Sequence, residues 1–169
     1  MKPLRPLKSY QQRELASQFP RLHDLAESFE DDGYKRITVS IFDHWLTTDE
    51  AVKLLDGVSL EDQEIRDLKH LKLNRQLVEN FSVYEFHFIG KKRDLVRFSS
   101  YTSKESILRA VQPEGRFGNG LSFFSLIIPD IKAVYFEGYD DTNTLFYRDE
   151  SLIQEFIFWV KEAGLNVIK

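Results

Sequence analysis

The chain has 169 residues, of which 42% are hydrophobic and 14% aromatic, and this composition excludes an intrinsically disordered protein. The complete lack of cysteine excludes disulfides, thiolate metal sites and thiol nucleophiles. A formal net charge of −4 argues against a general binder of the phosphate backbone of nucleic acids.

The N-terminal segment is basic and unlike a secretion signal. Residues 1–13 contain four basic residues and no acid, and the first ten residues include two prolines but no apolar stretch. No segment of the chain approaches the roughly 18 uninterrupted apolar residues of a transmembrane helix. Together with the lack of cysteine, these features predict a soluble cytoplasmic protein without a membrane partner, whose residues 1–8 form a flexible basic N-terminus.

The first third of the chain is predicted to be mainly helical. Two short helical patterns flank Pro20 between residues 9 and 31, and an alternating strand pattern follows over residues 35–42. Thr48 then precedes two acids, which is typical of a helix N-terminus, and Gly57 ends that helix. The helices of residues 9–31 are expected to cap the sheet.

A longer helix is predicted to begin at Ser59. Its Ile65, Leu68 and Leu71 recur at helical spacing, so they are expected to face the core. Residues 71–78 fit an extended segment as well as a helix, and the sequence leaves both alternatives open.

The second half of the chain is predicted to contain most of the sheet. Strands are expected over residues 81–89, 95–101, 121–128, 133–137 and 144–147. The first two would form a hairpin and the last three a C-terminal meander. A short helix is expected over residues 103–111.

The final helix, over residues 151–163, has the clearest pattern. Seven apolar side chains form one broad stripe: Leu152, Ile153, Phe156, Ile157, Trp159, Val160 and Ala163. Ser151 and Gln154 fit a capping box, and Gly164 fits a C-cap. Phe158 falls outside the stripe, so it either packs on a second layer of the protein or is an exposed contact residue.

The order of strands and helices is irregular, without the strict alternation of a doubly wound sheet. We therefore expect a single α+β domain over residues 1–169, with an antiparallel or mixed sheet of about five to six strands. The C-terminal helix and the N-terminal helices would cover one face of this sheet, and the other face would be partly open.

A segment that mixes aromatic rings with carboxylates, residues 134–150, is the candidate binding surface. Residues 130–155 contain seven acids and two bases. Exposed carboxylates would steer a cationic partner, and tyrosines would provide contact area at low entropic cost. The predicted partner-binding residues are Tyr135, Glu137, Tyr139, Asp140, Asp141, Tyr147, Asp149, Glu150 and Phe158. The alternative is a solvated end of the meander whose charges serve solubility.

The four histidines predict no metal site, because none of them is paired at a spacing typical of metal ligands. His44, beside Trp45 and just past a strand, is the best candidate for a pocket residue. Glu85 and His87 lie two residues apart on one strand face and are a candidate acid-base pair.

Two loops carry weaker signals for phosphate binding. The glycine-bearing loop of residues 112–120 follows a helix and precedes a strand, which is the reverse of the order in a phosphate cradle. Three bases over residues 91–93 are typical of a solvated hairpin tip. We therefore expect no cofactor and no nucleic-acid partner.

These features favour a non-catalytic protein-binding module. In general style, a small acidic α+β domain with an exposed aromatic edge resembles the immunity proteins that neutralise bacterial toxins. The resemblance implies an inhibitor that masks a basic cleft on a partner protein, such as a toxin or nuclease. Two alternatives are a small hydrolase-like enzyme that uses His44 or His87 with a carboxylate, and a self-associating structural subunit, that is, a homo-oligomer.

Overall fold

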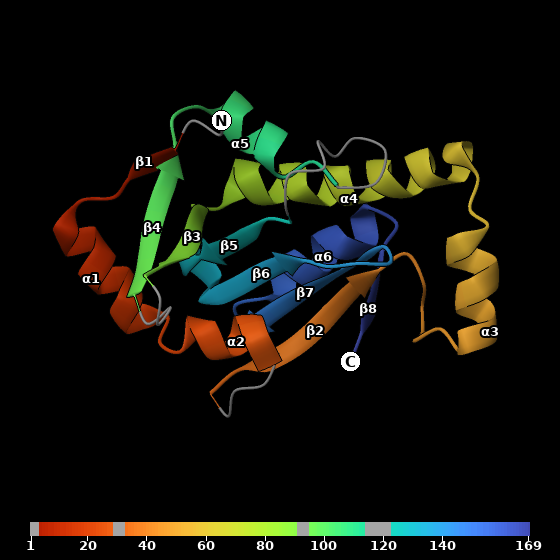
Figure 1. The fold of residues 1–169 in the computed structure, drawn as a ribbon, viewed down its shortest axis with the longest axis horizontal. Helices are drawn as coiled ribbons and strands as arrows, with labels where there is room; N and C mark the ends of the chain where they lie inside the picture. Colours follow the sequence, from red (N-terminus) through yellow and green to blue (C-terminus); the bar gives the residue numbers. More distant parts are fainter. Residues whose placement is uncertain (1–3, 29–32, 91–94, 114–122) are drawn as a thin grey trace.

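Eight strands form one antiparallel sheet in the computed structural model, in the order β1-β4-β3-β5-β6-β7-β2-β8 (Figure 1). The structure describes residues 4–28, 33–90, 95–113 and 123–169. The strands are β1 (Leu4–Pro6), β2 (Lys35–Ser40), β3 (Tyr84–Ile89), β4 (Leu95–Tyr101), β5 (Ser125–Ile128), β6 (Ala133–Glu137), β7 (Thr142–Tyr147) and β8 (Asn166–Ile168). The helices are α1 (Ser9–Gln18), α2 (Leu22–Ser28), α3 (Thr48–Ala51), α4 (Leu60–Asn80), α5 (Lys104–Ala110) and α6 (Gln154–Glu162), with a π-helical turn η1 (Val52–Asp56) and a 3-10 turn η2 (Pro129–Ile131).

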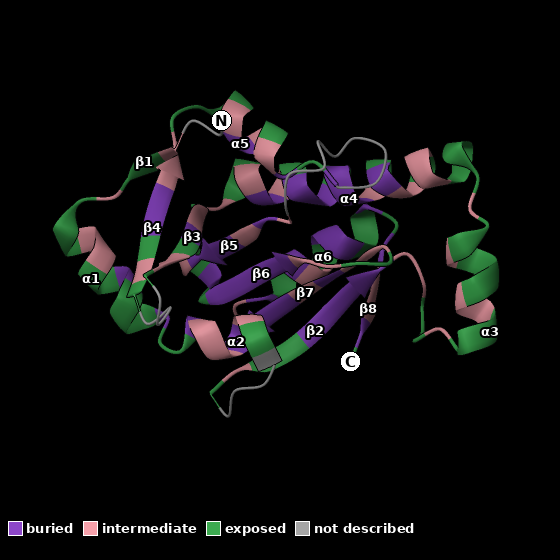
Figure 2. Cartoon of the chain, in the orientation of Figure 1, coloured by how far each residue is buried: buried purple, intermediate pink, exposed green. Residues whose placement is uncertain are grey.

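Helices cover both faces of the sheet, which confirms the α+β class and corrects the expectation of a partly open face. Leu15 and Leu25, from α1 and α2, pack with Phe136 in one core cluster. Leu73 of α4 and Phe156 of α6 belong to a second cluster, on the opposite face. The N-terminal and C-terminal helices therefore lie on different faces, and the sheet between them is largely buried (Figure 2).

The alternation predicted for β6 is confirmed, but both of its faces are buried. Val134 and Phe136 face the α1–α2 side, whereas Ala133 and Tyr135 face the α4–α6 side. A strand that is apolar at consecutive positions is typical of a sheet covered on both faces.

Two short edge strands account for the difference between the six strands expected and the eight observed. β1 pairs with β4, with Leu4 opposite Tyr101, inside the segment expected to be flexible. β8 adds to the free edge of β2. Each has three residues, too few to show a periodicity in the sequence, and short edge strands limit unwanted edge pairing.

The apolar stripe of α6 is confirmed, with Phe156 and Val160 fully buried. Gly164 has φ 77°, as a C-cap glycine requires. The capping box is wrong: α6 begins after Ile153, and Ser151 instead bonds Asp149 through its amide and its hydroxyl.

α4 is a continuous helix of 21 residues and about 31 Å, so residues 71–78 are helical. Its buried residues begin only at Asp67, because the first two turns project past the sheet. Ile65 and Leu68 are each 50% exposed, which corrects their predicted place in the core, whereas Leu71 is buried as expected. None of the described helices combines the length and apolar character needed to cross a membrane.

Candidate functional site

Two of the nine predicted partner-binding residues lie inside the protein. Tyr135 is fully buried against α6, and its hydroxyl accepts a hydrogen bond of 2.7 Å from Asn143 Nδ2. Burial raises the pKa of Tyr135 well above its ordinary range. Tyr147 is also buried. Because the sheet is covered on both faces, strand tyrosines that were expected at a surface are core residues, and we correct their assignment.

Asp149 and Glu150 lie at the opposite end of β7 from the β6–β7 turn. The six residues of β7 separate the two ends by about 20 Å. Hydrogen bonds from Ser151 lower the pKa of Asp149. Glu150 lies within 3.8 Å of Lys35 and 4.0 Å of Lys169. These two carboxylates therefore do not join the rest of the predicted surface.

Phe158 is 58% exposed on α6, which matches its predicted place outside the apolar stripe. Of its two alternative roles, internal packing on a second layer does not fit this exposure. A role as a contact residue stays a prediction.

The remaining four predicted residues gather at one pocket of about 380 Å³. Glu137, Tyr139, Asp140 and Asp141 line it from the end of β6 and the β6–β7 turn. The opposite wall is α4, through Gln63, Asp67, His70 and Asn74. We call this cavity the turn pocket.

The connection between β6 and β7 contains a four-residue turn, from Tyr139 to Thr142, whose two central residues are left-handed. Asp140 has φ 59° and Asp141 has φ 56°, and the Thr142 amide donates to the Tyr139 carbonyl at 3.1 Å. These features are those of a type I′ turn, whose twist matches that of the flanking strands. Aspartate tolerates this backbone conformation better than most residues with a Cβ. The turn presents Asp141 toward α4.

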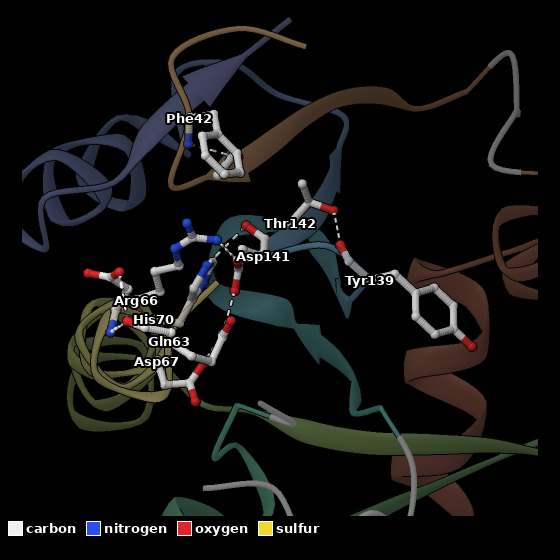
Figure 3. A network of polar contacts seen from close by, with 11 residues as sticks. Phe42, Gln63, Arg66, Asp67, His70, Tyr139, Asp141 and Thr142 are labelled. Carbon is white, nitrogen blue, oxygen red and sulfur yellow. Dashed lines mark hydrogen bonds and ion pairs between the residues drawn. The ribbon is translucent and has the colours of Figure 1, made fainter. Parts of the chain in front are cut away.

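Asp141 is held by three residues of α4 (Figure 3). Arg66 Nη1 lies 2.8 Å from one carboxylate oxygen, and Gln63 Nε2 donates to the other at 2.9 Å. His70 Nε2 lies 3.2 Å from the Asp141 carbonyl. With side chains only 14% and 9% exposed, Arg66 and Asp141 form a largely buried ion pair. Asp141 therefore anchors the β6–β7 turn to α4. We assign it this structural role in place of the predicted role of steering a partner.

The α4 wall of the turn pocket was missed by the sequence analysis. Gln63, Asp67, His70 and Asn74 are spaced by four, three and four residues, which places them on one stripe of the helix. Asp67, His70 and Asn74 are buried. A polar stripe at spacings where apolar core residues are usual was the available signal, whereas the predicted core face was based on Ile65 and Leu68.

Two buried side-chain atoms on the α4 wall, His70 Nδ1 and Asn74 Oδ1, have no hydrogen-bond partner among the described residues. Asn74 Nδ2 donates to the Val111 carbonyl at 2.7 Å, which orients the amide. Burial lowers the pKa of His70, although the nearby Asp141 and Asp67 oppose this shift. Unpaired buried polar atoms are uncommon, and they single out this pocket.

A second candidate surface is a continuous run of unburied residues. No residue from 41 to 66 is buried, and this segment contains α3, η1 and the first turns of α4. It holds seven acids and two bases, a formal charge of −5 against −4 for the whole chain. We call residues 41–66 the acidic arm. Figure 1 shows α3 at the end of the molecule opposite α1.

The acidic arm also exposes large apolar side chains. They are Trp45 at 58%, Val52 at 57%, Leu54 at 37%, Leu60 at 77% and Ile65 at 50%. This is half of the ten large hydrophobic residues that are exposed in the described chain, so the apolar exposure is concentrated on the same segment as the negative charge.

Local hydrogen bonds order the two helix starts of the acidic arm, and its last residues, Gln63 and Arg66, bond Asp141. Thr47 and Glu50 form a capping box at the start of α3, with the Thr47 amide donating to Glu50 at 2.8 Å. Ser59 caps α4. His44 bridges Asp43 at 2.6 Å and Glu50 at 3.2 Å. These two hydrogen bonds raise the pKa of His44, and the bond to Asp43 makes the larger contribution.

His44 and Trp45 line a second pocket, of about 180 Å³, as the sequence predicted for His44. Its walls include Phe42 and Ala51, and it meets the turn pocket at Leu55, which lines both cavities. The acidic arm thus carries an indentation as well as protruding side chains.

Of the two histidines named in the enzyme alternative, His44 lies beside two carboxylates, Asp43 and Glu50. The other predicted pair, Glu85 and His87, has neighbours on β4. Glu85 accepts a hydrogen bond from the Tyr101 hydroxyl, and His87 lies opposite Arg97 on β4. No group of three or more acidic or histidine side chains in the described residues is arranged to hold a metal ion. The glycine-bearing loop predicted over residues 112–120, from residue 114 on, and the bases of residues 91–93 lie outside the described residues.

Comparison with known proteins adds no functional information: no family model, curated protein or solved structure matches the chain. The candidate sites therefore rest on the geometry of this chain alone.

Proposed function

We propose that the protein is a non-catalytic binding module whose acidic arm docks on a basic surface of a partner protein. In this proposal the domain is an inhibitor that masks a basic cleft, as implied by its general resemblance to the immunity proteins that neutralise bacterial toxins. The surface differs from the one predicted from the sequence, because the arm takes the place of the C-terminal meander.

The observation that carries the proposal is the coincidence of charge and apolar exposure on the arm. Its formal charge of −5 would steer a cationic surface and speed association at low salt. Trp45 and Leu60, both more than half exposed, would provide the buried centre of the contact. Large apolar side chains cost solubility when exposed on an unbound protein, so their concentration on one segment favours an interaction site.

The way in which the arm is ordered supports the same role. Caps at Thr47 and Ser59 fix its two helix starts. A surface ordered before binding loses less conformational entropy when the complex forms. The side chains that protrude from it contribute little to folding, so substitutions there should leave the domain intact.

The proposal is tested with a charge variant of the arm. Asp49→Asn, Asp56→Asn and Glu61→Gln together remove three negative charges, and these side chains make no ion pair or hydrogen bond within the described residues. The tagged wild-type and variant proteins are used to capture proteins from nuclease-treated native lysate, washed at low and high salt. The wild type is expected to retain one stoichiometric basic protein, weakened by salt, which the variant loses.

A matched variant controls for net charge. Glu14→Gln, Glu105→Gln and Glu155→Gln remove the same charge from exposed positions outside the arm. Capture by this control is expected to equal that of the wild type. Equal loss in both variants would mean that only net charge matters, and equal retention would remove the arm from the contact. If the tagged protein retained only further copies of the same chain, this result would favour self-association.

A further inference from the structure

We infer that the protein associates head to tail with a second copy of itself, with Tyr10 of one copy inserted into a pocket on the acidic arm of the next. The pocket is the cavity of about 180 Å³ that Phe42, His44, Trp45 and Ala51 line, and we call it the arm pocket. The inference goes beyond the proposed function and does not need its partner, because both surfaces belong to this chain.

The arm pocket has mainly apolar walls and one exposed carboxylate. Phe42, Trp45, Leu55 and Ile168 provide the apolar surface. The volume lies below the roughly 300 to 1,000 Å³ of small-molecule sites, so the pocket suits a single side chain better than a larger ligand. Asp140 also lines it, is exposed, and makes no side-chain hydrogen bond or ion pair with a described residue.

The charge around the arm pocket is negative in either protonation state of His44. The His44 ring lies between Asp43, at 2.6 Å, and Glu50, at 3.2 Å. A protonated ring offsets one of these two carboxylates, and the other remains together with that of Asp140. The pocket therefore favours an apolar side chain whose neighbours are basic.

The opposite end of the same molecule presents such a side chain. Tyr10, in the first turn of α1, is 57% exposed. Arg5, Lys8 and Arg13 flank it in the sequence, each exposed and without an ion pair to a described residue. The first acid of the chain is Glu14. An exposed ring among three bases complements an apolar pocket among carboxylates.

Tyr10 is the best-matched occupant among the exposed apolar side chains outside the arm. Tyr139 is followed by two aspartates, and α6, which carries Phe158, holds two glutamates and one lysine. Both therefore lie in regions with the same sign of charge as the pocket. The exposed leucines outside the arm lack an aromatic ring that could pack on those of Phe42 and Trp45.

The two surfaces of one molecule cannot meet each other. α1 and α3 lie at opposite ends of the molecule (Figure 1). α1 is fixed to the sheet, because Leu15 is buried and Gln12 Nε2 donates to the Phe98 carbonyl at 2.7 Å. Tyr10 therefore reaches only the arm pocket of another copy. Such a contact joins two different surfaces, so every dimer keeps one free Tyr10 and one free pocket to which further copies can add.

The test is sedimentation velocity over a dilution series that extends to roughly 1 mM. The wild type is expected to associate as its concentration rises and to dissociate at high salt, because salt screens attraction between surface charges. Tyr10→Ser removes the ring and Ala51→Leu fills the arm pocket, so each change alone is expected to weaken self-association at least roughly tenfold.

A mixture of these two variants identifies the contact. The intact Tyr10 of the Ala51→Leu protein fits the intact pocket of the Tyr10→Ser protein, so the equimolar mixture is expected to form a 1:1 heterodimer and nothing larger. A mixture of folded variants that stays monomeric would overturn the inference. A wild type that is monomeric at every concentration, or undiminished association of each variant alone, would overturn it as well.

Two more variants guard against effects on folding. Tyr10→Phe keeps the ring and is expected to retain the association. Trp45→Ala changes a pocket wall at an exposed position, so it serves as the pocket variant if amide spectra show that Ala51→Leu perturbs the fold. Loss of association in Tyr10→Phe, with the fold intact, would contradict insertion of the ring.

Charge variants test the electrostatic part of the contact. Lys8→Gln with Arg13→Gln is expected to weaken self-association roughly fivefold and to reduce its salt dependence. Arg75→Gln with Lys161→Gln removes the same charge from exposed positions on α4 and α6 and is expected to change neither. Equal effects of the two pairs would mean that only net charge matters, which contradicts the contact.

The Tyr10→Ser protein also separates this inference from the proposed function. Self-association covers part of the acidic arm and competes with a partner, so this variant is expected to lose self-association and still capture a basic protein. Capture by a wild type that never self-associates would refute the inference and leave the proposed function standing. Self-association without any captured partner would support the inference and count against the proposed function.

Discussion

Replacing Asp141 with Asn is expected to destabilise the fold by about 2 to 3 kcal/mol. The substitution keeps the shape of the side chain and its tolerance of the left-handed backbone, so it removes mainly the charge. Arg66 then loses its partner at 2.8 Å while its side chain stays 86% buried, because only 14% of it is exposed. Breaking a fully buried ion pair costs about 3 to 5 kcal/mol. Because both side chains of this pair are slightly exposed, we expect a cost at or below the lower end of that range.

The neighbouring residue provides a matched control. Asp140 has almost the same φ but is exposed, so Asp140→Asn is expected to change stability by no more than about 0.5 kcal/mol. Urea unfolding followed by circular dichroism measures both free energies of unfolding. For a domain of this size, the Asp141 variant should also melt roughly 5 to 10 °C lower. If the two variants lost the same small amount of stability, the ion pair would be screened by solvent and would not anchor the turn to α4.

Four further predictions concern His70, the β6–β7 turn and the acidic arm. His70 is expected to titrate at lower pH than His44 in an NMR titration, since burial lowers the pKa of His70 and Asp43 with Glu50 raise that of His44; the reverse order would contradict both environments. Because the pKa of His70 in the folded protein lies below the unfolded value of 6.5, the fold keeps its full stability above that pH. As the pH falls below 6.5, the unfolded chain binds a proton more readily than the folded protein does, and the free energy of unfolding decreases. Asp140→Gly is expected to stabilise the fold by roughly 0.5 kcal/mol in urea unfolding, because glycine accepts φ 59° without strain, and a loss of stability would argue against strain at this turn. Trp45→Ala is expected to leave the unfolding midpoint unchanged but to weaken a captured complex at least about tenfold by calorimetry, and full affinity would exclude Trp45 as an anchor.

The local periodicities that predicted α6 and β6 were reliable because their side chains meet a core on the expected face. Phe156 and Val160 face inward at helical spacing, and Val134 alternates with Tyr135 along the strand. Alternation along one strand did not predict that helices also cover the second face of the sheet. Consecutive apolar positions in β6 were the signal that both faces are covered, and this coverage moved Tyr135 and Tyr147 from the predicted surface into the core.

The errors in α4 have a different physical cause. A helical stripe predicts which residues share a face, but it does not tell where the neighbouring sheet ends. Ile65 and Leu68 share a face and are exposed, because the first turns of α4 extend beyond the sheet. His70 and Asn74 are buried although polar, because the β6–β7 turn brings Asp141 across to α4, a contact between residues far apart in the chain. Both candidate sites depend on such placement.

The most direct test of the proposed binding surface is a map of amide chemical shifts when the captured partner is added to the ¹⁵N-labelled protein. The perturbed amides are expected to concentrate in residues 41–66, with Trp45 and Leu60 among the most affected. Perturbations confined to the sheet edges or to α1 and α2, with residues 41–66 unchanged, would contradict the role of the acidic arm.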